Sequence, residues 1–240
     1  MVAEMTHQAL HPESPAYPAA LRAAFRRAPA LAAMGNTALL EQPGLGFCGS
    51  RKASERGRRA AVDCAEQAVG EGFTVVAGNA AGIDVAAHHA ALAAGGTTVL
   101  VLPEGINHFR IRKVLRPVWD WDRALVLSQF PDHAPWKGRQ AMERNSVIIG
   151  LSRAMVVVEA GESGGTWNAG LATLDAGKPL FVAVYEGMEA TTPGNTRLLE
   201  RGARGLARSR RTGRANLKPV KDAVAATPAA VATEAQPALL

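Results

Sequence analysis

Short apolar runs alternate with amphipathic stretches along most of this sequence. Six runs rich in Val, Leu and Ala have the length of buried strands and lie at residues 45–48, 73–77, 97–102, 125–128, 155–159 and 180–184. Helical spacing occurs between them, at residues 54–69, 84–94, 111–119, 140–151 and 166–176. This alternation predicts an α/β fold, a doubly wound and mostly parallel sheet with helices on both faces.

The two ends of the chain lack this pattern. Residues 1–16 show no sustained periodicity and are expected to be disordered, and residues 17–43 are predicted to be a helical lead-in packed on the main domain. The main domain is predicted at residues 44–203, closed by a short helix at 195–201. Residues 204–240 are basic at first and then rich in Ala and Pro, so we expect a disordered tail.

The positive charge is concentrated near the C-terminus. Eight of the 27 Lys and Arg residues but two of the 21 Asp and Glu residues lie beyond residue 200, so this part supplies the whole net charge of +6. Within the body, basic clusters occur at residues 51–59, 110–116 and 137–144. Whether these clusters share one face decides between attraction of nucleic acid and ordinary solvated helix surfaces.

The cysteines and the hydropathy indicate a cellular setting. Cys48 and Cys64 fall in a predicted strand and a predicted helix without metal-ligand spacing, which fits a reduced cytoplasm. Apolar runs stay well below the roughly 18 to 20 residues of a membrane span. The N-terminus has acidic Glu4 and no apolar segment typical of a signal peptide. We therefore expect a cytoplasmic protein without a membrane partner.

The loops at the carboxyl ends of the strands hold the candidate binding residues. A doubly wound sheet binds its ligand there, and free backbone N–H groups at a helix start favour an anion. Asp84 is expected to cap the helix that follows the second loop. The candidate phosphate-binding residues are Gly49, Ser50, Arg51 and Lys52 in the first loop; Gly78, Asn79, Ala80 and Gly82 in the second; Lys137, Arg139, Arg144 and Asn145 around the fourth; and Ser163, Gly164, Gly165 and Thr166 in the fifth.

Two familiar nucleotide motifs are missing at these loops. A dinucleotide site needs G-x-G-x-x-G after the first strand, where this sequence has Gly46-Phe-Cys-Gly49, and no Walker lysine motif occurs. His88 and His89 point about 100° apart on a helix and have no third ligand with suitable spacing, so packing or surface roles are favoured. No cofactor and no metal are predicted. An α/β turn with two glycines that binds nothing remains the alternative.

Several short motifs in register resemble the DNA-processing protein A family, also called DprA or Smf. They are Gly49-Ser-Arg51, Gly78-x-Ala80-x-Gly82-Ile-Asp84, Ala87-His88, Arg144-Asn145, Val157-Val-Glu159, Ser163-Gly164, Asn195-Thr-Arg-Leu-Leu199 and Gly202-Ala203. The match runs from about residue 17 to residue 203. The resemblance implies an extended Rossmann-like fold, binding of single-stranded DNA without cleavage, loading of a RecA-type recombinase during natural transformation, and a homodimer.

Where this sequence departs from the family pattern, its binding loops lose positive charge. Ala77 and Ala81 stand where the family usually has serine and arginine in the second loop, and Ser146 stands where it has a further arginine. Each lost cation removes about one released counterion from DNA binding, so we expect weaker binding. The helical domain in front and the winged helix behind, which many members carry, are not expected here. Base stacking is expected, if at all, from Phe109, Trp136 and Trp167.

A rival hypothesis comes from another class of protein. The run Ser163-Gly-Gly-Thr166 is closer to the related lysine-decarboxylase-like branch, which includes nucleoside-monophosphate phosphoribohydrolases. An enzyme or nucleotide sensor of that branch would use Glu159 or Glu162 as its acid–base group. The same two carboxylates also fit a helix-terminus acid and a solvated loop residue. A protein that docks a partner through an apolar surface is a third possibility.

Overall fold

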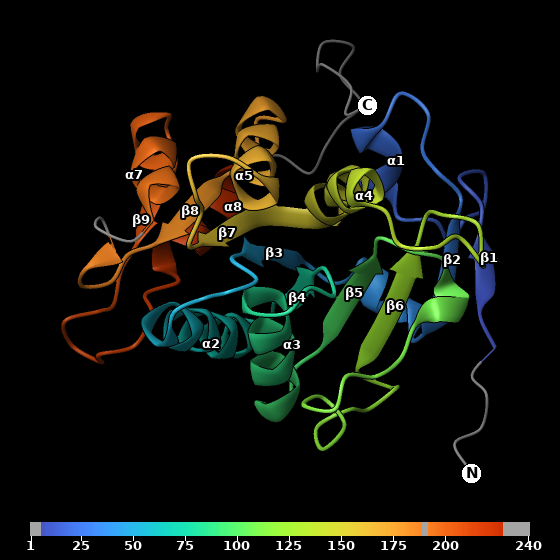
Figure 1. The fold of residues 1–240 in the computed structure, drawn as a ribbon, viewed down its shortest axis with the longest axis horizontal. Helices are drawn as coiled ribbons and strands as arrows, with labels where there is room; N and C mark the ends of the chain where they lie inside the picture. The colour runs from blue at the N-terminus through green and yellow to red at the C-terminus, as the bar shows by residue number, and fades with distance from the viewer. Residues whose placement is uncertain (1–5, 189–191, 228–240) are drawn as a thin grey trace.

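The computed structural model describes residues 6–188 and 192–227, which build one nine-stranded sheet (Figure 1). The spatial order of the strands is β1-β2-β6-β5-β4-β3-β7-β8-β9. In this spatial order, the strands from β6 through β5, β4, β3, β7 and β8 to β9 are all parallel to one another. Strands β1 and β2 are added at the β6 edge and are antiparallel to their neighbours. The strands are β1 (Gln8–Leu10), β2 (Leu31–Gly35), β3 (Gly44–Gly49), β4 (Thr74–Ala77), β5 (Thr98–Leu102), β6 (Ala124–Ser128), β7 (Ser152–Val158), β8 (Leu180–Ala183) and β9 (Arg204–Leu206).

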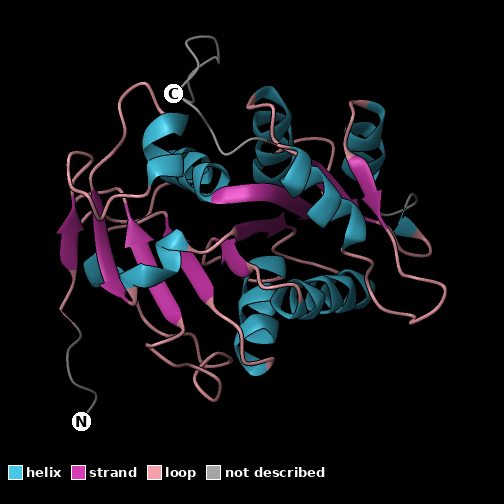
Figure 2. Cartoon of the chain, turned by 180° about the vertical axis from the view of Figure 1, so that it is seen from behind, coloured by secondary structure: helices cyan, strands magenta, loops and turns pink. Residues whose placement is uncertain are grey.

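Helices cover both faces of the sheet (Figure 2). One layer contains α1 (Ala19–Ala24), α4 (Gly138–Leu151), α5 (Gly165–Asp175) and α7 (Pro193–Glu200). The other layer contains α2 (Glu55–Gly70), α3 (Ile83–Ala93) and α8 (Lys218–Ala226). Two 3-10 helices, η1 (Thr37–Glu41) and η2 (Ile106–His108), lie in connections. The predicted α/β class, with its doubly wound and mostly parallel sheet, is confirmed.

The central strands are apolar on both faces because both faces are covered. In β3, Leu45 and Phe47 pack in the core on the side of α2 and α3, whereas Cys48 packs in the core on the side of α4. The chain then builds β4, β5 and β6 on one side of β3, and β7 and β8 on the other. The order of strands therefore reverses between β3 and β7, which is the place where such sheets bind their ligands.

Both ends of the chain are more ordered than their composition indicates. The expected disorder is wrong for residues 6–16, where β1 pairs with β2, and for residues 204–227, which form β9 and α8. Buried Leu206 and Val220 explain the second case, since each adds to the core on the α2 side. Residues 1–5 and 228–240, the remaining parts of the expected disorder, lie outside the described residues.

Two segments of the expected secondary structure also differ. The helical lead-in contains strand β2, whose alanine-rich sequence resembles a helix but pairs with β6. The helix expected at residues 111–119 is a series of turns, in which Leu115 N donates to Arg112 O and Val118 N to Leu115 O. Pro117 has no N–H group for a helical bond. Within the described ranges, no helix has both the length and the apolar character needed to cross a membrane.

Candidate functional site

A cleft opens at the topological switch point between β3 and β7. Its volume is about 340 Å3, and its walls come from the end of β3, the second loop, α4 and the start of α5. Four loops that lie far apart in the sequence therefore meet at one place. The residues that line the cleft are Phe47, Cys48, Gly49, Arg51, Ala80, Asp84, Gly138, Ala141, Met142, Arg144, Asn145, Ile148, Gly165 and Thr166.

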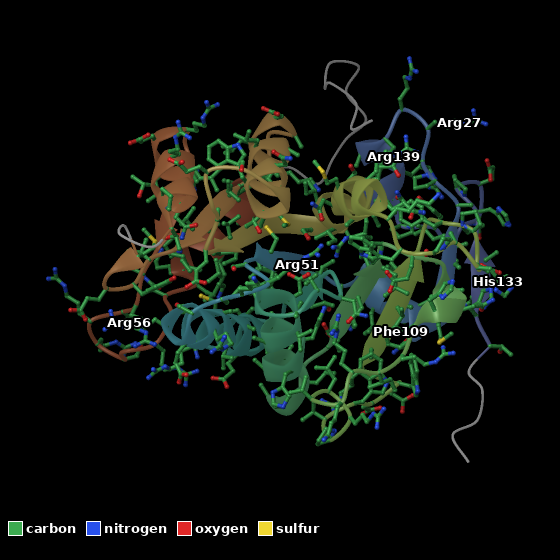
Figure 3. All side chains as sticks on the ribbon, viewed as in Figure 1. Arg27, Arg51, Arg56, Phe109, His133 and Arg139 are labelled. Carbon is green, nitrogen blue, oxygen red and sulfur yellow. The ribbon has the colours of Figure 1, made fainter. Side chains whose placement is uncertain are left out.

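Arg51 connects the first loop to the fourth. Its guanidinium carbon lies 5.8 Å from the ring centroid of Trp136, a cation–π contact, and the Trp136 side chain is 53% exposed. Lys137 follows Trp136 directly and precedes α4. Arg51 lies near the middle of the molecule, and Arg139 lies at the start of α4 (Figure 3). The mouth of the cleft thus combines positive charges with an exposed aromatic face.

Arg144 is buried at the inner wall of the cleft. Its side chain is 6% exposed, its Nη1 atom donates to the carbonyl oxygen of Val101 over 3.1 Å, and its Nε atom has no hydrogen-bond partner among the described residues. A Cβ atom at Gly78 would overlap its guanidinium group. Burial lowers the pKa of Arg144, but the group stays charged because arginine begins so far above neutral pH.

Asp84 lies opposite Arg144 and holds the second loop. Its Oδ2 atom is 4.0 Å from Arg144 Nη1 and accepts a hydrogen bond of 3.3 Å from Ala80 N. Burial raises the pKa of Asp84, while the charge of Arg144 acts in the opposite direction. Gly82, with φ of 84°, is the N-cap of α3 and packs against the backbone of Ser50. Asp84 lies inside α3, so the expectation that it caps this helix is wrong. The second loop is therefore fixed from inside by α3 and α4.

The second basic cluster reaches the same region. Arg112 Nε donates to Asn79 Oδ1 over 2.9 Å, and its Nη2 atom donates to the Asn79 carbonyl oxygen. The backbone and side chain of Asn79 are thus occupied by an arginine of the protein itself. Part of the positive charge of residues 110–116 consequently lies beside the second loop.

The fifth loop presents open backbone at the start of α5. Gly164 has φ of 94°, and a Cβ atom added at Gly164 or Gly165 would meet nothing within 4 Å. The loop is held from behind, because Asn195 Oδ1 accepts from Ala160 N over 2.7 Å and Gly194 packs on the Gly161 carbonyl. Gly165 and Thr166, the first residues of α5, line the cleft, and the N–H groups of a first helical turn have no partner within the helix.

The remaining predicted residues lie beside the cleft without lining it. Lys52, Lys137 and Arg139 are exposed, and no ion pair involves any of the three within the described part of the chain. Ser50 Oγ accepts from Lys52 N over 3.1 Å and so shapes the first loop. The predicted residues outside the lining are Ser50, Lys52, Gly78, Asn79, Gly82, Lys137, Arg139, Ser163 and Gly164.

Glu159 and Glu162, the acids of the rival hypothesis, lie outside the cleft lining. Glu159 is 7% exposed, has φ of 60°, and accepts hydrogen bonds from Ser54 N over 2.9 Å and from Tyr185 Oη over 2.7 Å. The Ser54 hydroxyl, which also caps α2, donates to the same carboxylate. Glu162 is exposed and lies 3.9 Å from Arg197. Glu159 therefore fastens the start of α2 to the end of β7.

Other polar groups near the cleft are structural. Burial raises the pKa of the Cys48 thiol to about 12, so this wall of the cleft carries an unreactive thiol. His88 is fully buried and lies 2.6 Å from both the Thr98 hydroxyl and the Gly78 carbonyl oxygen. No group of three or more His, Cys, Asp or Glu residues in the described ranges is arranged to hold a metal ion.

The aromatic residues expected to stack on bases differ in availability. Phe109 is 7% exposed and packs 5.7 Å from Trp119, so the expectation is wrong for this residue. Trp167 lies beneath Arg197 and Arg201, at 6.0 and 5.7 Å from their guanidinium carbons. Trp136 alone of the three combines high exposure with a place at the cleft mouth.

The sequence prediction named Arg144 and Asn145 on α4 but missed the other residues of this helix that line the cleft. Gly138, Met142 and Ile148, which it missed, line the cleft together with Asn145. They recur at intervals of three and four residues, which places them on one helix face. Met142 is 48% exposed, an apolar side chain at a solvent-facing helix position. The spacing of these residues in the sequence could therefore have indicated that this face of the helix, next to Arg144, lines the site.

Fold and cleft together define an extended Rossmann-like protein with a cleft at its topological switch point, lined by Arg51 and Arg144. The model of the family described as DNA recombination-mediator protein A matches residues 8–212. Because this match covers most of the chain, the chain belongs to that family.

Individual relatives agree with this assignment. The chain is 32% identical over 173 residues to DNA processing protein DprA of Streptococcus pneumoniae, covering 71% of this chain and 60% of that protein. The chain thus spans less than two thirds of this relative. The X-ray structure of the pneumococcal protein superposes with a TM-score of 0.74 at 28% identity, covering 83% of this chain and 71% of that one.

A second solved structure shares the fold at lower sequence identity. It is DNA processing protein A from Helicobacter pylori, with a TM-score of 0.73, 23% identity, and coverage of 85% of this chain and 93% of that one. That structure concerns the single-stranded DNA binding mode of the Helicobacter protein.

Proposed function

We propose that this chain binds single-stranded DNA along the carboxyl edge of its sheet, does not cut it, and delivers it to a RecA-type recombinase. The family description as a recombination mediator supports this role. The single-stranded DNA binding mode of the Helicobacter relative supports single-stranded DNA as the ligand. A homodimer, a cytoplasmic setting and a role in natural transformation belong to the same proposal, as properties that the family resemblance implies.

The contact between Arg51 and Trp136 carries this proposal. Arg51 contacts Trp136, which Lys137 follows in the sequence, and Arg51 lines the cleft together with Gly165 and Thr166 at the start of α5. A phosphate backbone needs several cations along one path, and an unpaired base needs an exposed aromatic face. The contact between Arg51 and Trp136 supplies a cation and an exposed aromatic face together at the mouth of the cleft.

The exposed and the buried cations have different roles in this proposal. Arg51, Lys52, Lys137 and Arg139 are the phosphate contacts, because their side chains reach solvent. Arg144 is a positioning residue, because its charge faces Asp84 and its guanidinium fills the space over Gly78. Trp136 offers its ring face to a base. Binding is therefore led by phosphates and independent of sequence.

Absence of cleavage is part of the proposal. A nucleotide hydrolase of the related branch would need a carboxylate that reaches the ligand, but Glu159 is occupied by Ser54 and Tyr185. Both oxygens of Glu159 accept hydrogen bonds from residues of the protein itself, so its role is structural.

Fluorescence anisotropy with a labelled oligo-dT of about 30 nucleotides tests the proposal. We expect binding that weakens steeply with salt, and a clear loss of affinity in Arg51→Ala and Lys137→Ala. Arg153→Ala is the matched control, because Arg153 is exposed and lies at the start of β7, at the edge of the sheet opposite the cleft. Binding that does not respond to salt, or an equal loss in all three variants, would contradict the proposal.

A parallel assay distinguishes DNA binding from the rival hypothesis of a nucleotide hydrolase. The wild-type protein is incubated with a panel of nucleoside monophosphates, and release of the free base is followed by chromatography. Hydrolysis without binding of the DNA strand would favour the enzyme of the related branch. Delivery to the recombinase is tested by adding RecA to strands coated with a single-stranded DNA-binding protein and measuring whether this chain accelerates filament formation.

A further inference from the structure

The chain that follows β9 forms a well-built hairpin, residues 207–216, here called the C-terminal hairpin. Arg208 and Ala215 pair in an antiparallel bridge, and Asn216 N donates to Ala207 O over 3.0 Å. At its tip, Ser209 N donates to Arg214 O over 2.8 Å, and Gly213 N donates to Ser209 O over 2.8 Å. The basic sequence of this segment is therefore displayed in a defined conformation.

A carboxylate in the middle of α2 docks this hairpin. Asp63 is 7% exposed, its Oδ2 atom accepts from Ala215 N over 2.8 Å, and its Oδ1 atom accepts from Arg214 Nε. Arg208 Nε lies 3.4 Å from Asp63 Oδ2, and Arg214 also donates to Glu66. Two of the hairpin arginines are thus neutralised by α2, and their role is to hold the hairpin in place.

The two arginines at the tip remain available. Arg210 and Arg211 are exposed, and neither forms an ion pair with any acid in the described part of the chain. The turn that carries them is closed further by Arg211 N, which donates to Ser209 Oγ over 3.2 Å. Because the turn is already fixed, little backbone conformational entropy is lost when its arginines bind an anion.

The C-terminal hairpin leaves the sheet at the same edge as the cleft. Strands β3, β7, β8 and β9 are parallel neighbours, so residue 207 leaves the sheet at the edge where Arg51 follows β3. Three strand spacings separate the two positions along the sheet, roughly 15 Å. Arg56 lies between them at the start of α2, where its Nη1 atom donates to Glu186 O over 3.1 Å. Figure 3 shows Arg56 at the end of α2 that the C-terminal hairpin approaches in Figure 1.

We propose that the tip of the C-terminal hairpin is a second phosphate contact for the DNA strand that occupies the cleft. This inference rests on the proposed function and extends it to a part of the chain that the cleft does not include. Arg210 and Arg211 contact the backbone of the strand where it leaves the cleft past Arg56. Asp63 acts through the hairpin as a positioning residue, although its own charge repels DNA.

This positioning role predicts the opposite change in DNA affinity, on replacing Asp63, from the change that its charge alone predicts. If only the summed charge mattered, removal of an acid would strengthen DNA binding. If Asp63 positions the C-terminal hairpin, Asp63→Asn frees the hairpin and weakens binding of a long strand. A matched control is Glu41→Gln, because Glu41 is an exposed acid in η1, before β3, and has no part in docking the hairpin.

The test compares labelled oligo-dT strands of about six and about 30 nucleotides by fluorescence anisotropy. In the double variant Arg210→Ala/Arg211→Ala, we expect the affinity for the long strand to fall about tenfold near physiological salt. The slope of log K against log salt should decrease by about 1.4, the value for two lost contacts to a single strand. Affinity for the short strand, which fits the cleft alone, should stay at the wild-type value. Asp63→Asn should weaken binding of the long strand, and Glu41→Gln should not.

The outcomes distinguish this inference from the proposed function. Wild-type binding of the long strand, lost in Arg51→Ala but unchanged in affinity and salt slope in Arg210→Ala/Arg211→Ala, would overturn the inference alone. Tighter binding by Asp63→Asn would also overturn it. A wild-type protein that binds neither strand would overturn both proposals. The double variant changes exposed positions, so it decides the question even if Asp63→Asn does not fold.

Discussion

The second and fifth loops both bring glycines to the carboxyl edge of the sheet, but different atoms face those glycines. In the second loop, the space in front of Gly78 is filled by the Arg144 guanidinium, and the space in front of Gly82 by the backbone of Ser50. In the fifth loop, Gly164 and Gly165 face open space. The second loop therefore serves the packing of the protein itself, and the fifth loop leaves its backbone free for a ligand.

This difference corrects a simple interpretation of glycine-rich loops. A glycine is needed wherever backbone must be approached closely, and the approaching group can belong to the protein as well as to a ligand. Sequence spacing cannot distinguish the two cases at Gly78 and Gly165. The distinction lies in the position of Arg144, more than 60 residues after Gly78.

The largest expected effect on stability comes from the second loop, where Arg144 fills the space in front of Gly78. In Gly78→Ala, the new methyl group overlaps the Arg144 guanidinium, which must leave its place beside Asp84. Overpacking together with an unpaired buried charge should lower the free energy of unfolding by about 4 kcal/mol or more. Urea denaturation measures the loss, and Gly165→Ala is the control with the same chemical change. A stable Gly78→Ala protein would show that Arg144 moves easily.

The buried pair itself gives the next effect. Arg144→Ala leaves the Asp84 carboxylate buried without its partner, so we expect a loss of about 3 to 5 kcal/mol. In this variant the pKa of Asp84 should rise further, because burial then acts without the opposing charge of Arg144. The loss should therefore be larger at neutral pH, where Asp84 must ionise, than at about pH 4, where it can stay protonated.

A double-mutant cycle connects these two predictions. Once Arg144 is alanine, the space in front of Gly78 is empty, so adding Gly78→Ala should cost little more. The two losses should thus be strongly non-additive, as expected for residues in contact. Additive losses would mean that Gly78 and Arg144 act on the fold separately.

His88 provides a pH-dependent test of the same loop. Its Nε2 atom donates to the carbonyl oxygen of Gly78, because a carbonyl can only accept, and its Nδ1 atom lies 2.6 Å from the Thr98 hydroxyl oxygen. Burial lowers the pKa of His88 from 6.5 to about 4, so the folded protein keeps the imidazole neutral while the unfolded chain gains a proton. Stability is therefore complete above about pH 6.5 and falls as the pH is lowered towards 4, by up to roughly 3 kcal/mol.

The measurement is the free energy of unfolding between pH 4 and 7.5. His88→Gln should be less stable at neutral pH but should lose most of this dependence on pH. His89→Gln, one position along α3, changes a partly exposed side chain and should keep it. A pH dependence that persists in His88→Gln would assign it to other groups.

The sequence alone predicts the parallel sheet because its strands are buried on both faces. β5 (TVLVL) and β7 (SRAMVVV) are apolar almost throughout, which is a local signal. β2 (LAAMG) is not predictable in this way, since its alanines have no preference for strand and it forms only by pairing with β6. The tail is a similar case. Its basic composition hides Leu206, Val220 and the docking of Arg214 on Asp63.

The sequence predicts which loops form the candidate site, but it does not predict which of their residues are buried and which are exposed to a ligand. The fold rule places the loops after β3, β4 and β7 at one edge, so their candidates could be named from the sequence. The burial of Arg144 could not, because arginine is usually exposed and its partner Asp84 lies 60 residues away. The contact between Arg51 and Trp136 depends on the path of a long loop, which no local pattern determines.

The smallest expected effect on stability tests the open side of the comparison. Gly165→Ala places a methyl group in free space at the first position of α5, where alanine is a good helix former, so the free energy of unfolding should change by less than about 0.5 kcal/mol. The methyl group nevertheless stands in front of the N–H groups that we propose for a phosphate. We expect the affinity for oligo-dT to fall by about threefold to tenfold, measured by anisotropy on protein with an unchanged melting temperature. Unchanged affinity in Gly165→Ala would show that the strand passes over the cleft mouth without entering the fifth loop, leaving Arg51 and Lys137 as its main contacts.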